Sequence, residues 1–155
     1  MKTRAEVAPL ILSLGLAGLV VMADNWVVSP ILPAIARDVG TSPVSAAVLI
    51  AAYMLPFGLF QLLYGPLADR YGKLRVLRLT MIGFTVAAGL TAIGATLTDL
   101  TIYRVVTGAF AAATMPVSLA LIGDTVRMEE RQSAIGQFMG ISFLGQGLSM
   151  GIGGA

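Results

Sequence analysis

Residues 44–64, VSAAVLIAAYMLPFGLFQLLY, run directly into residues 65–75, GPLADRYGKLR. The first stretch carries no charge, and no charged residue occurs anywhere between Asp38 and Asp69. A helix needs about 20 consecutive apolar residues to cross a bilayer. The second stretch combines glycines with four charged residues. This boundary therefore predicts a membrane-spanning helix that ends in a short basic turn.

Similar uncharged stretches recur along the chain, at residues 7–23, 79–98, 105–123 and 132–155. Each is long, continuous and not alternating, which favours helices over strands. We therefore expect an all-α fold, a polytopic membrane helix bundle that forms a single transmembrane domain over residues 1–155. The first apolar run, from about Val7 to Ile35, is longer than the apolar core of a signal peptide, which favours a retained helix. About five spans are expected, at residues 9–32, 44–64, 76–96, 100–122 and 133–154.

Composition excludes several classes of protein. Of the 155 residues, 57% are hydrophobic and only 12% are charged, about half the charged fraction of a soluble domain. His and Cys are absent, which removes the residues that Ser-His, thiol and zinc chemistry need. An intramembrane aspartyl enzyme needs two carboxylates, and only Asp24 is well placed. We expect no enzyme, no catalytic residue, no metal and no cofactor.

The basic residues lie on one side of the expected bundle. Eight of the ten fall at the N-terminus or in the connections after the second and fourth spans, and such asymmetry marks the cytoplasmic side. The N-terminus is therefore expected to be cytoplasmic. Because these residues lie in membrane loops, the net charge of +2 does not predict a nucleic-acid partner. The eight residues are Lys2, Arg4, Arg70, Lys73, Arg75, Arg78, Arg127 and Arg131.

The turn at residues 65–75 resembles the signature of the major facilitator superfamily, Gly-x-x-x-Asp-Arg-x-Gly followed by basic residues. Leu74 stands where a basic residue is common. The resemblance implies a conformational latch, whose charged residues bind other helix ends in one open state and release them in the other. Asp124, at the end of the fourth span, is expected to pair with a cation of the turn. The expected latch residues are Gly65, Asp69, Arg70, Gly72, Lys73, Arg75 and Asp124.

Two charges lie inside expected spans, Asp24 in the first and Arg104 in the fourth. Charged residues in the membrane usually face an interior and carry function, and a pair lowers the cost of desolvation. In one interpretation Asp24 exchanges a proton or meets a cationic substrate, and Arg104 tunes it. In the other, the two form a static ion pair, or Arg104 extends to the headgroups.

Three further motifs are similar to those of drug:proton antiporters in this superfamily. Asp24 precedes Pro33 by nine residues, and Arg104 precedes Gly108 by four. The resemblance implies that Arg104 takes part in proton coupling. In the last span, Gly147 and Gly151 have the spacing of the antiporter glycines, with Ile152 in place of the expected proline. Gly136 and Gly140 are also four residues apart, and glycines at this spacing predict close helix packing.

The resemblance covers the whole chain and implies the N-terminal portion of a transporter built from two six-helix bundles. The sixth helix and the C-terminal half are expected to be missing. The implied function is proton-coupled efflux of small compounds or drugs by alternating access. The implied partners are the lipid bilayer, protons, a small-molecule substrate, and either the missing half or a second copy. The implied location is the cell membrane, most simply a bacterial inner membrane. Two alternatives stay open: a membrane module that does not transport, and a half-sized transporter that works as a dimer.

Overall fold

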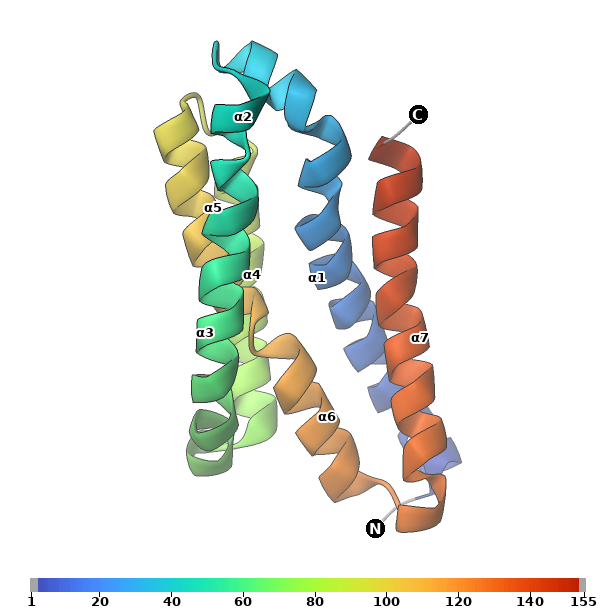
Figure 1. Cartoon of the computed structure of the whole chain (residues 1–155). Coiled ribbons are helices and arrows are strands. Elements are labelled where there is room, and N and C mark those ends of the chain that lie inside the picture. The colour runs from blue at the N-terminus through green and yellow to red at the C-terminus, as the bar shows by residue number, and fades with distance from the viewer. Residues whose placement is uncertain (1–2, 154–155) are drawn as a thin grey trace.

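The computed structural model describes residues 3–153, which form seven helices and no strand (Figure 1). The predicted all-α fold is therefore confirmed. Lys2 and the expected end of the fifth span at residue 154 lie outside the described residues. The helices are α1 (Arg4–Asp38), α2 (Pro43–Ala46), α3 (Val48–Tyr71), α4 (Lys73–Thr91), α5 (Leu97–Ala111), α6 (Thr114–Thr125) and α7 (Met128–Gly153).

Four helical stretches of the described residues are long and apolar enough to cross a membrane, at Ala5–Asp38, Pro43–Tyr71, Lys73–Thr91 and Leu97–Thr125. They contain the whole of the first, second and fourth expected spans, whereas the third helix ends at Thr91, five residues before the expected end of the third span. The first is longer than expected because Thr3 and Glu6 form a capping box that starts α1 early. The fifth expected span falls on α7, whose 26 residues are long enough to cross a bilayer. Its serines, glutamines and glycines make it less apolar than the other four.

The fourth expected span is broken in the middle, between α5 and α6. Pro116 explains the position of the break, because proline lacks the N–H that would bond to the carbonyl four residues earlier, that of Ala112. α5 ends at Ala111, and Ala112 is its C-cap residue. The break redirects the chain, so that α6 crosses from the α3–α4 side of the molecule towards the base of α7 (Figure 1).

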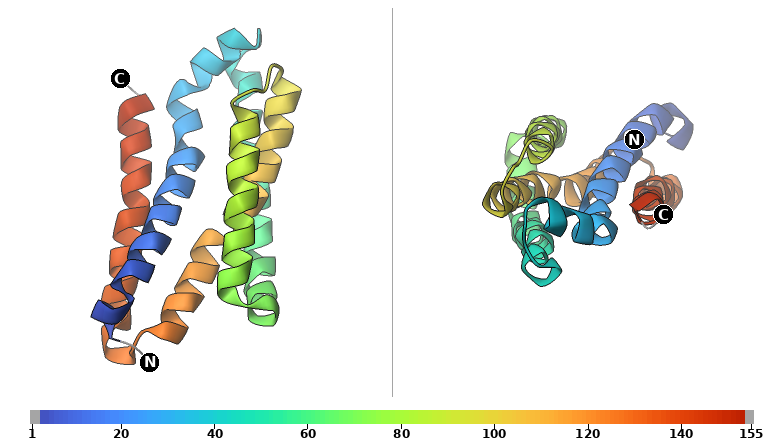
Figure 2. Two further views of the ribbon diagram at one scale, coloured as in Figure 1. Left: turned by 180° about the vertical axis from the view of Figure 1, so that it is seen from behind. Right: turned by 90° about the horizontal axis from the view of Figure 1, so that it is seen from above.

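The helices pack in two groups that α6 joins. α1 packs mainly along α7, whereas α5 packs on α3 and α4 (Figure 2). Each group contains one close approach between helix backbones. A Cβ added at Gly108 of α5 would lie 2.3 Å from the carbonyl oxygen of Tyr53 in α3. A Cβ added at Gly145 of α7 would lie 2.0 Å from the carbonyl oxygen of Leu19 in α1. Only glycine allows backbones to come this close.

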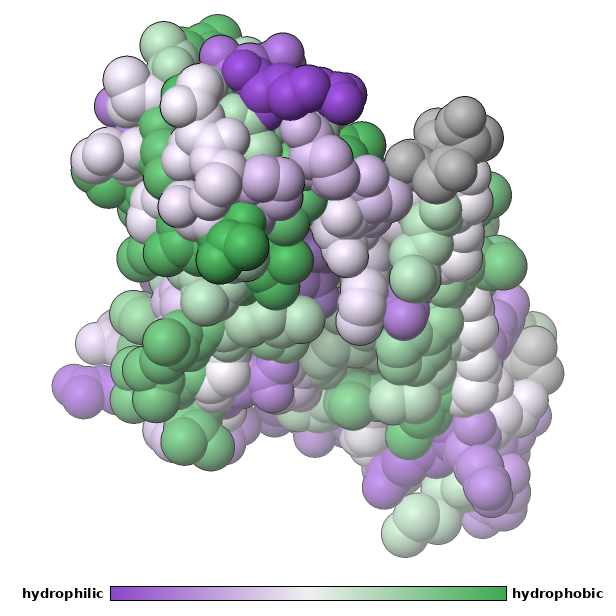
Figure 3. Space-filling view, turned by 45° about the horizontal axis from the view of Figure 1, so that its top comes forward, coloured by the Kyte–Doolittle hydropathy of each residue, from purple (hydrophilic) through white to green (hydrophobic). Residues whose placement is uncertain are grey.

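The connections divide between two ends of the bundle. The N-terminus, the α3–α4 turn and the α6–α7 connection lie at one end, and the α1–α2 and α4–α5 connections lie at the other (Figures 1 and 2). Between the ends, large hydrophobic side chains stay exposed, for example Leu62 of α3 and Ile82 of α4. Figure 3 shows hydrophobic surface on the flanks and the strongest hydrophilic colour towards the ends. This distribution is that of a bundle surrounded by lipid.

Candidate functional site

Arg104 is the largest fully enclosed side chain among the described residues, only 2% exposed at the middle of α5. Its Nη1 donates a hydrogen bond to Oδ2 of Asp24 at 3.0 Å and another to the backbone carbonyl of Asp24 at 3.3 Å. The expected contact between these residues of the first and fourth spans is therefore present. Arg104 does not extend to the headgroups. Pairing offsets part of the cost of placing both charges in an apolar interior.

Tyr53 of α3 completes this cluster, and the sequence analysis did not identify it. Its side chain is fully buried, and its ring centroid lies 4.2 Å from Cζ of Arg104, in cation–π contact. Gly108, one turn after Arg104, lets α5 approach the backbone of Tyr53 closely enough for this contact. The available signal was a single tyrosine among aliphatic residues at mid-span, but nothing in the sequence says which helix it faces.

Asp24 connects the buried cluster to an open groove between α1 and α7. Its side chain is 21% exposed, in contrast to that of Arg104. The groove wall is otherwise almost entirely apolar, and from α7 it receives Leu148 and Ser149. Asp24 is thus both bonded to Arg104 and accessible from the groove. The remaining lining residues are Val20, Ala23, Val27 and Ile31 of α1.

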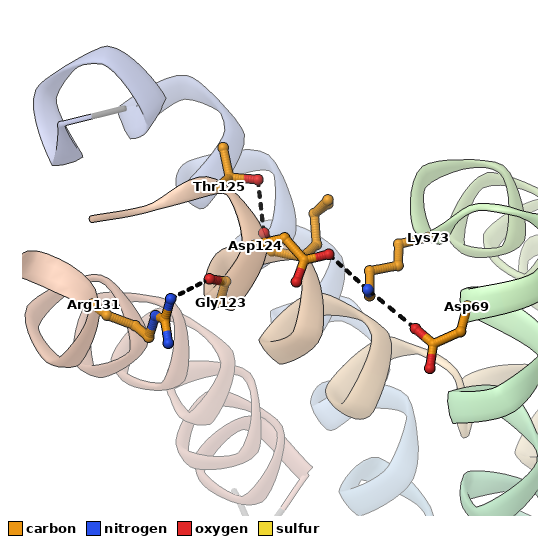
Figure 4. A network of polar contacts seen from close by, with 7 residues as sticks. Asp69, Lys73, Gly123, Asp124, Thr125 and Arg131 are labelled. Carbon is orange, nitrogen blue, oxygen red and sulfur yellow. Dashed lines mark hydrogen bonds and ion pairs between the residues drawn. The ribbon is translucent and has the colours of Figure 1, made fainter. Parts of the chain in front are cut away.

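At the end of the bundle that carries the N-terminus, Lys73 bridges two carboxylates (Figure 4). Its Nζ lies 3.1 Å from Oδ1 of Asp69 and 2.6 Å from Oδ2 of Asp124. The first pair is local, but the second joins the start of α4 to the end of α6. The expected pairing of Asp124 is thus present, with Lys73 as its partner. Nearby, Arg131 of α7 donates to the carbonyl of Gly123, which ties α7 to the same helix end.

The other expected latch residues differ in their surroundings. Gly72 has a φ of +91°, a conformation that favours glycine, so the tight turn between α3 and α4 depends on it. Gly65 has open space where a Cβ would be, so no described helix approaches it closely. Arg70 lies over the ring of Tyr71. Arg75 lines a groove along α3 and α4 and a second groove that Asp124 also lines, but the ion-pair partner of Asp124 is Lys73.

The glycines of α7 do not pack as the sequence suggests. Gly147 and Gly151 have no described atom within 4 Å of an added Cβ, and the same holds for Gly136 and Gly140. Within the described residues, the expectation of close packing at these four positions is wrong. The close contact is made instead by Gly145. The physical reason is helix rotation: α7 turns the Gly145 side towards α1 and leaves the other glycines on an open face.

No cluster of three or more potential metal ligands occurs in the described part of the chain. The buried cluster consists of one carboxylate from α1, one guanidinium from α5 and one phenol ring from α3.

Comparison with known proteins identifies the class. The family model described as Major Facilitator Superfamily matches residues 14–155, and the chain belongs to this superfamily. It is 38% identical over 138 residues to the puromycin resistance protein pur8 of Streptomyces alboniger, covering 88% of this chain and 27% of that protein. It is 29% identical to citrate exporter 1 of Aspergillus niger, covering 98% of this chain and 29% of that protein. It is 31% identical to the quinolone resistance protein NorA of Staphylococcus aureus, covering 82% of this chain and 33% of that protein.

These matches confirm the expected resemblance, a membrane transporter family with drug-resistance relatives rather than an enzyme. The chain spans between about a quarter and a third of the length of these relatives.

Proposed function

We propose that these helices belong to the first bundle of a proton-coupled exporter of small compounds, in which Asp24 takes up and releases the coupling proton. The observation that carries this proposal is the single carboxylate bonded to a buried arginine at 3.0 Å and partly open to a groove. In such a pair, protonation of Asp24 would leave the charge of Arg104 without its counter-ion. The loss of the ion pair changes the free energy of packing α1 against α5. Binding of a proton can therefore be coupled to a rearrangement of these helices.

The groove favours cationic or amphipathic compounds as substrates. Its wall is apolar apart from Asp24 and Ser149, so it would bind the apolar part of a compound and attract a positive group. The relatives named for puromycin and quinolone resistance support a drug-like substrate, whereas the relative named as a citrate exporter shows that one fold serves different compounds.

The complete transporter in this proposal contains helices beyond these residues, since this chain matches only 27% of the puromycin resistance protein and 33% of the quinolone resistance protein. A continuation of the reading frame with seven further spans would support it. Its location would be a bacterial inner membrane, with the N-terminal end of the bundle in the cytoplasm, where Arg70, Lys73 and Arg127 gather.

The proposal assigns the charged turn at residues 65–75 the role of a conformational latch. Lys73 joins α4 to α6 through Asp124, and breaking this contact would free the end of α6 to move. The latch carboxylates are largely exposed, at 69% for Asp69 and 62% for Asp124. Exposed ion pairs contribute about 0–1 kcal/mol to stability. The latch can therefore open without a large cost, as a cycling transporter requires.

Replacing Asp24 with asparagine tests the proposed function. In the protein encoded by the complete reading frame, reconstituted in liposomes, an imposed pH gradient should drive uptake of a fluorescent cationic drug in the wild type. In Asp24→Asn the gradient should have no effect, while exchange without a gradient continues. Asp38→Asn, at the exposed end of α1, is the matched control and should behave as wild type. Gradient-driven uptake that persists in Asp24→Asn would refute the assignment.

Replacing Asp69 with asparagine tests the latch. We expect a shift between outward-open and inward-open populations and only a small change in unfolding free energy, because the Asp69 carboxylate is 69% exposed. Cysteine accessibility on the two membrane sides of the complete protein measures the populations. Glu129→Gln, which removes an exposed carboxylate near Arg127 at the same end, is the control. Equal accessibility in Asp69→Asn and wild type would reject the latch role.

A further inference from the structure

Tyr53 is held in place from two sides. Its side chain is fully buried, its ring stacks on Phe57 of the same helix, and its backbone carbonyl lies against Gly108 of α5. The ring therefore has little freedom to turn away from Arg104, whose Cζ lies 4.2 Å from the ring centroid. A desolvated cation–π contact of this kind is strong enough to matter for the position of the guanidinium.

The contacts of Arg104 fall into two kinds. The bond to the Asp24 carboxylate at 3.0 Å depends on the charge of that carboxylate. The bond to the Asp24 backbone carbonyl at 3.3 Å and the contact with the Tyr53 ring do not. When Asp24 is neutral, only the bond to the backbone carbonyl and the contact with the ring keep their full strength. The guanidinium, now without a counter-ion, is better solvated near water or headgroups.

We propose that Tyr53 is a positioning residue, whose ring keeps the Arg104 guanidinium buried between α1 and α3 while Asp24 is neutral. The inference deepens the proposed function, because it needs Asp24 to be neutral at one stage of the cycle. With the guanidinium held in place, Asp24 loses its proton beside a positive charge and the pair re-forms. Without the ring, Arg104 leaves, and the proton is retained.

The charged and titratable side chains of the cluster come from α1, α3 and α5. They are Asp24 from α1, Tyr53 from α3 and Arg104 from α5, while the α7 residues beside Asp24, Leu148 and Ser149, carry no charge. Asp24 and Arg104 are therefore the two charged groups of the cluster, and Tyr53 contributes through its ring.

The hydroxyl of Tyr53 supplies a matched control. Its Oη is buried and makes no hydrogen bond within the described residues. Phenylalanine at this position keeps the ring and breaks no hydrogen bond to them. Leucine removes the ring and keeps a large apolar side chain. Comparing Tyr53→Phe with Tyr53→Leu therefore isolates the contribution of the ring.

The experiment measures how fast phenylglyoxal modifies Arg104 in the purified, complete protein, by mass spectrometry of its peptide. Asp24→Asn imitates the neutral carboxyl. Arg104 should stay protected in Asp24→Asn and in Asp24→Asn with Tyr53→Phe. It should react about thirtyfold faster in Asp24→Asn with Tyr53→Leu, from the usual strength of a desolvated cation–π contact. Arg127, 55% exposed, is the internal reference and should react equally in every variant.

Fast modification in Asp24→Asn alone, or protection that survives loss of the ring, would overturn the proposal. If the double variant with leucine does not purify as a single species, Tyr53→Leu alone is labelled across a range of pH. Modification of Arg104 relative to Arg127 should then rise in acid in Tyr53→Leu, and not in wild type or Tyr53→Phe. A ratio that does not change with pH in Tyr53→Leu would equally overturn it.

This test is separate from that of the proposed function, since it measures no transport. If gradient-driven uptake persisted in Asp24→Asn while the labelling followed the expected pattern, the coupling role of Asp24 would fail and the positioning role of Tyr53 would stand. If coupling failed in Asp24→Asn and labelling were unaffected by the ring, the reverse would hold.

Discussion

Replacing Arg104 with alanine is expected to abolish proton-driven transport and to destabilise the bundle. The substitution removes both hydrogen bonds to Asp24 and the contact with the ring of Tyr53. It leaves a carboxylate whose side chain is four-fifths enclosed and which lacks a counter-ion. Breaking a buried pair on one side typically costs about 3–5 kcal/mol. Because Asp24 keeps some exposure, we expect the lower end of that range.

Two companion variants distinguish coupling from a static ion pair. Arg104→Lys keeps the charge but loses the planar guanidinium, which binds two oxygens of Asp24 and lies over the ring of Tyr53. We therefore expect partial transport activity. The double variant Asp24→Asn with Arg104→Ala removes both charges. It should recover most of the lost stability, because no lone charge remains, but should not recover gradient-driven transport.

The measurements are thermal unfolding in detergent and drug uptake by liposomes under a pH gradient. If the double variant regained transport along with stability, the pair would be structural and the coupling role would be wrong. Proton-driven uptake that stayed intact in Arg104→Ala alone would lead to the same conclusion.

The sequence predicts the spans well because a bilayer imposes a simple rule: apolar runs of sufficient length form helices. It also predicts the contact of Asp24 with Arg104, since isolated charges in the membrane seek partners. It does not predict that the fourth span breaks at Ala112, although Pro116 is visible, because α1 and α3 continue through their own prolines. Whether a proline ends a helix depends on the tertiary packing around it.

Rotation of a helix about its axis is the other quantity that the sequence leaves open. α7 carries glycines on several faces, so the spacing alone cannot select the one that meets α1. The same ambiguity hid Tyr53, whose role depends on which side of α3 faces α5. In a soluble helix a polar face would fix the rotation, but in lipid the outer face is as apolar as the inner one.

Replacing Gly145 with alanine is expected to separate α7 from α1 and to lower stability by about 1–3 kcal/mol, the usual cost of overpacking. An added Cβ would lie 2.0 Å from the backbone carbonyl oxygen of Leu19. A backbone carbonyl cannot change rotamer as a side chain can, so one of the two helices must move. The groove beside Asp24 lies between the same two helices and would change shape with them.

Gly147 provides the matched comparison for this contact, since it lies on the same helix two residues further on, with no described atom within 4 Å of an added Cβ. Within these helices, Gly147→Ala should leave the α1–α7 packing intact, and alanine also favours the helix. A disulfide between cysteines placed at facing positions of α1 and α7, such as Gly15 and Ile141, reports the packing directly. It should form readily in Gly147→Ala and poorly in Gly145→Ala. Equal cross-linking and equal unfolding temperature in Gly145→Ala and wild type would show that α7 presents a different face to α1.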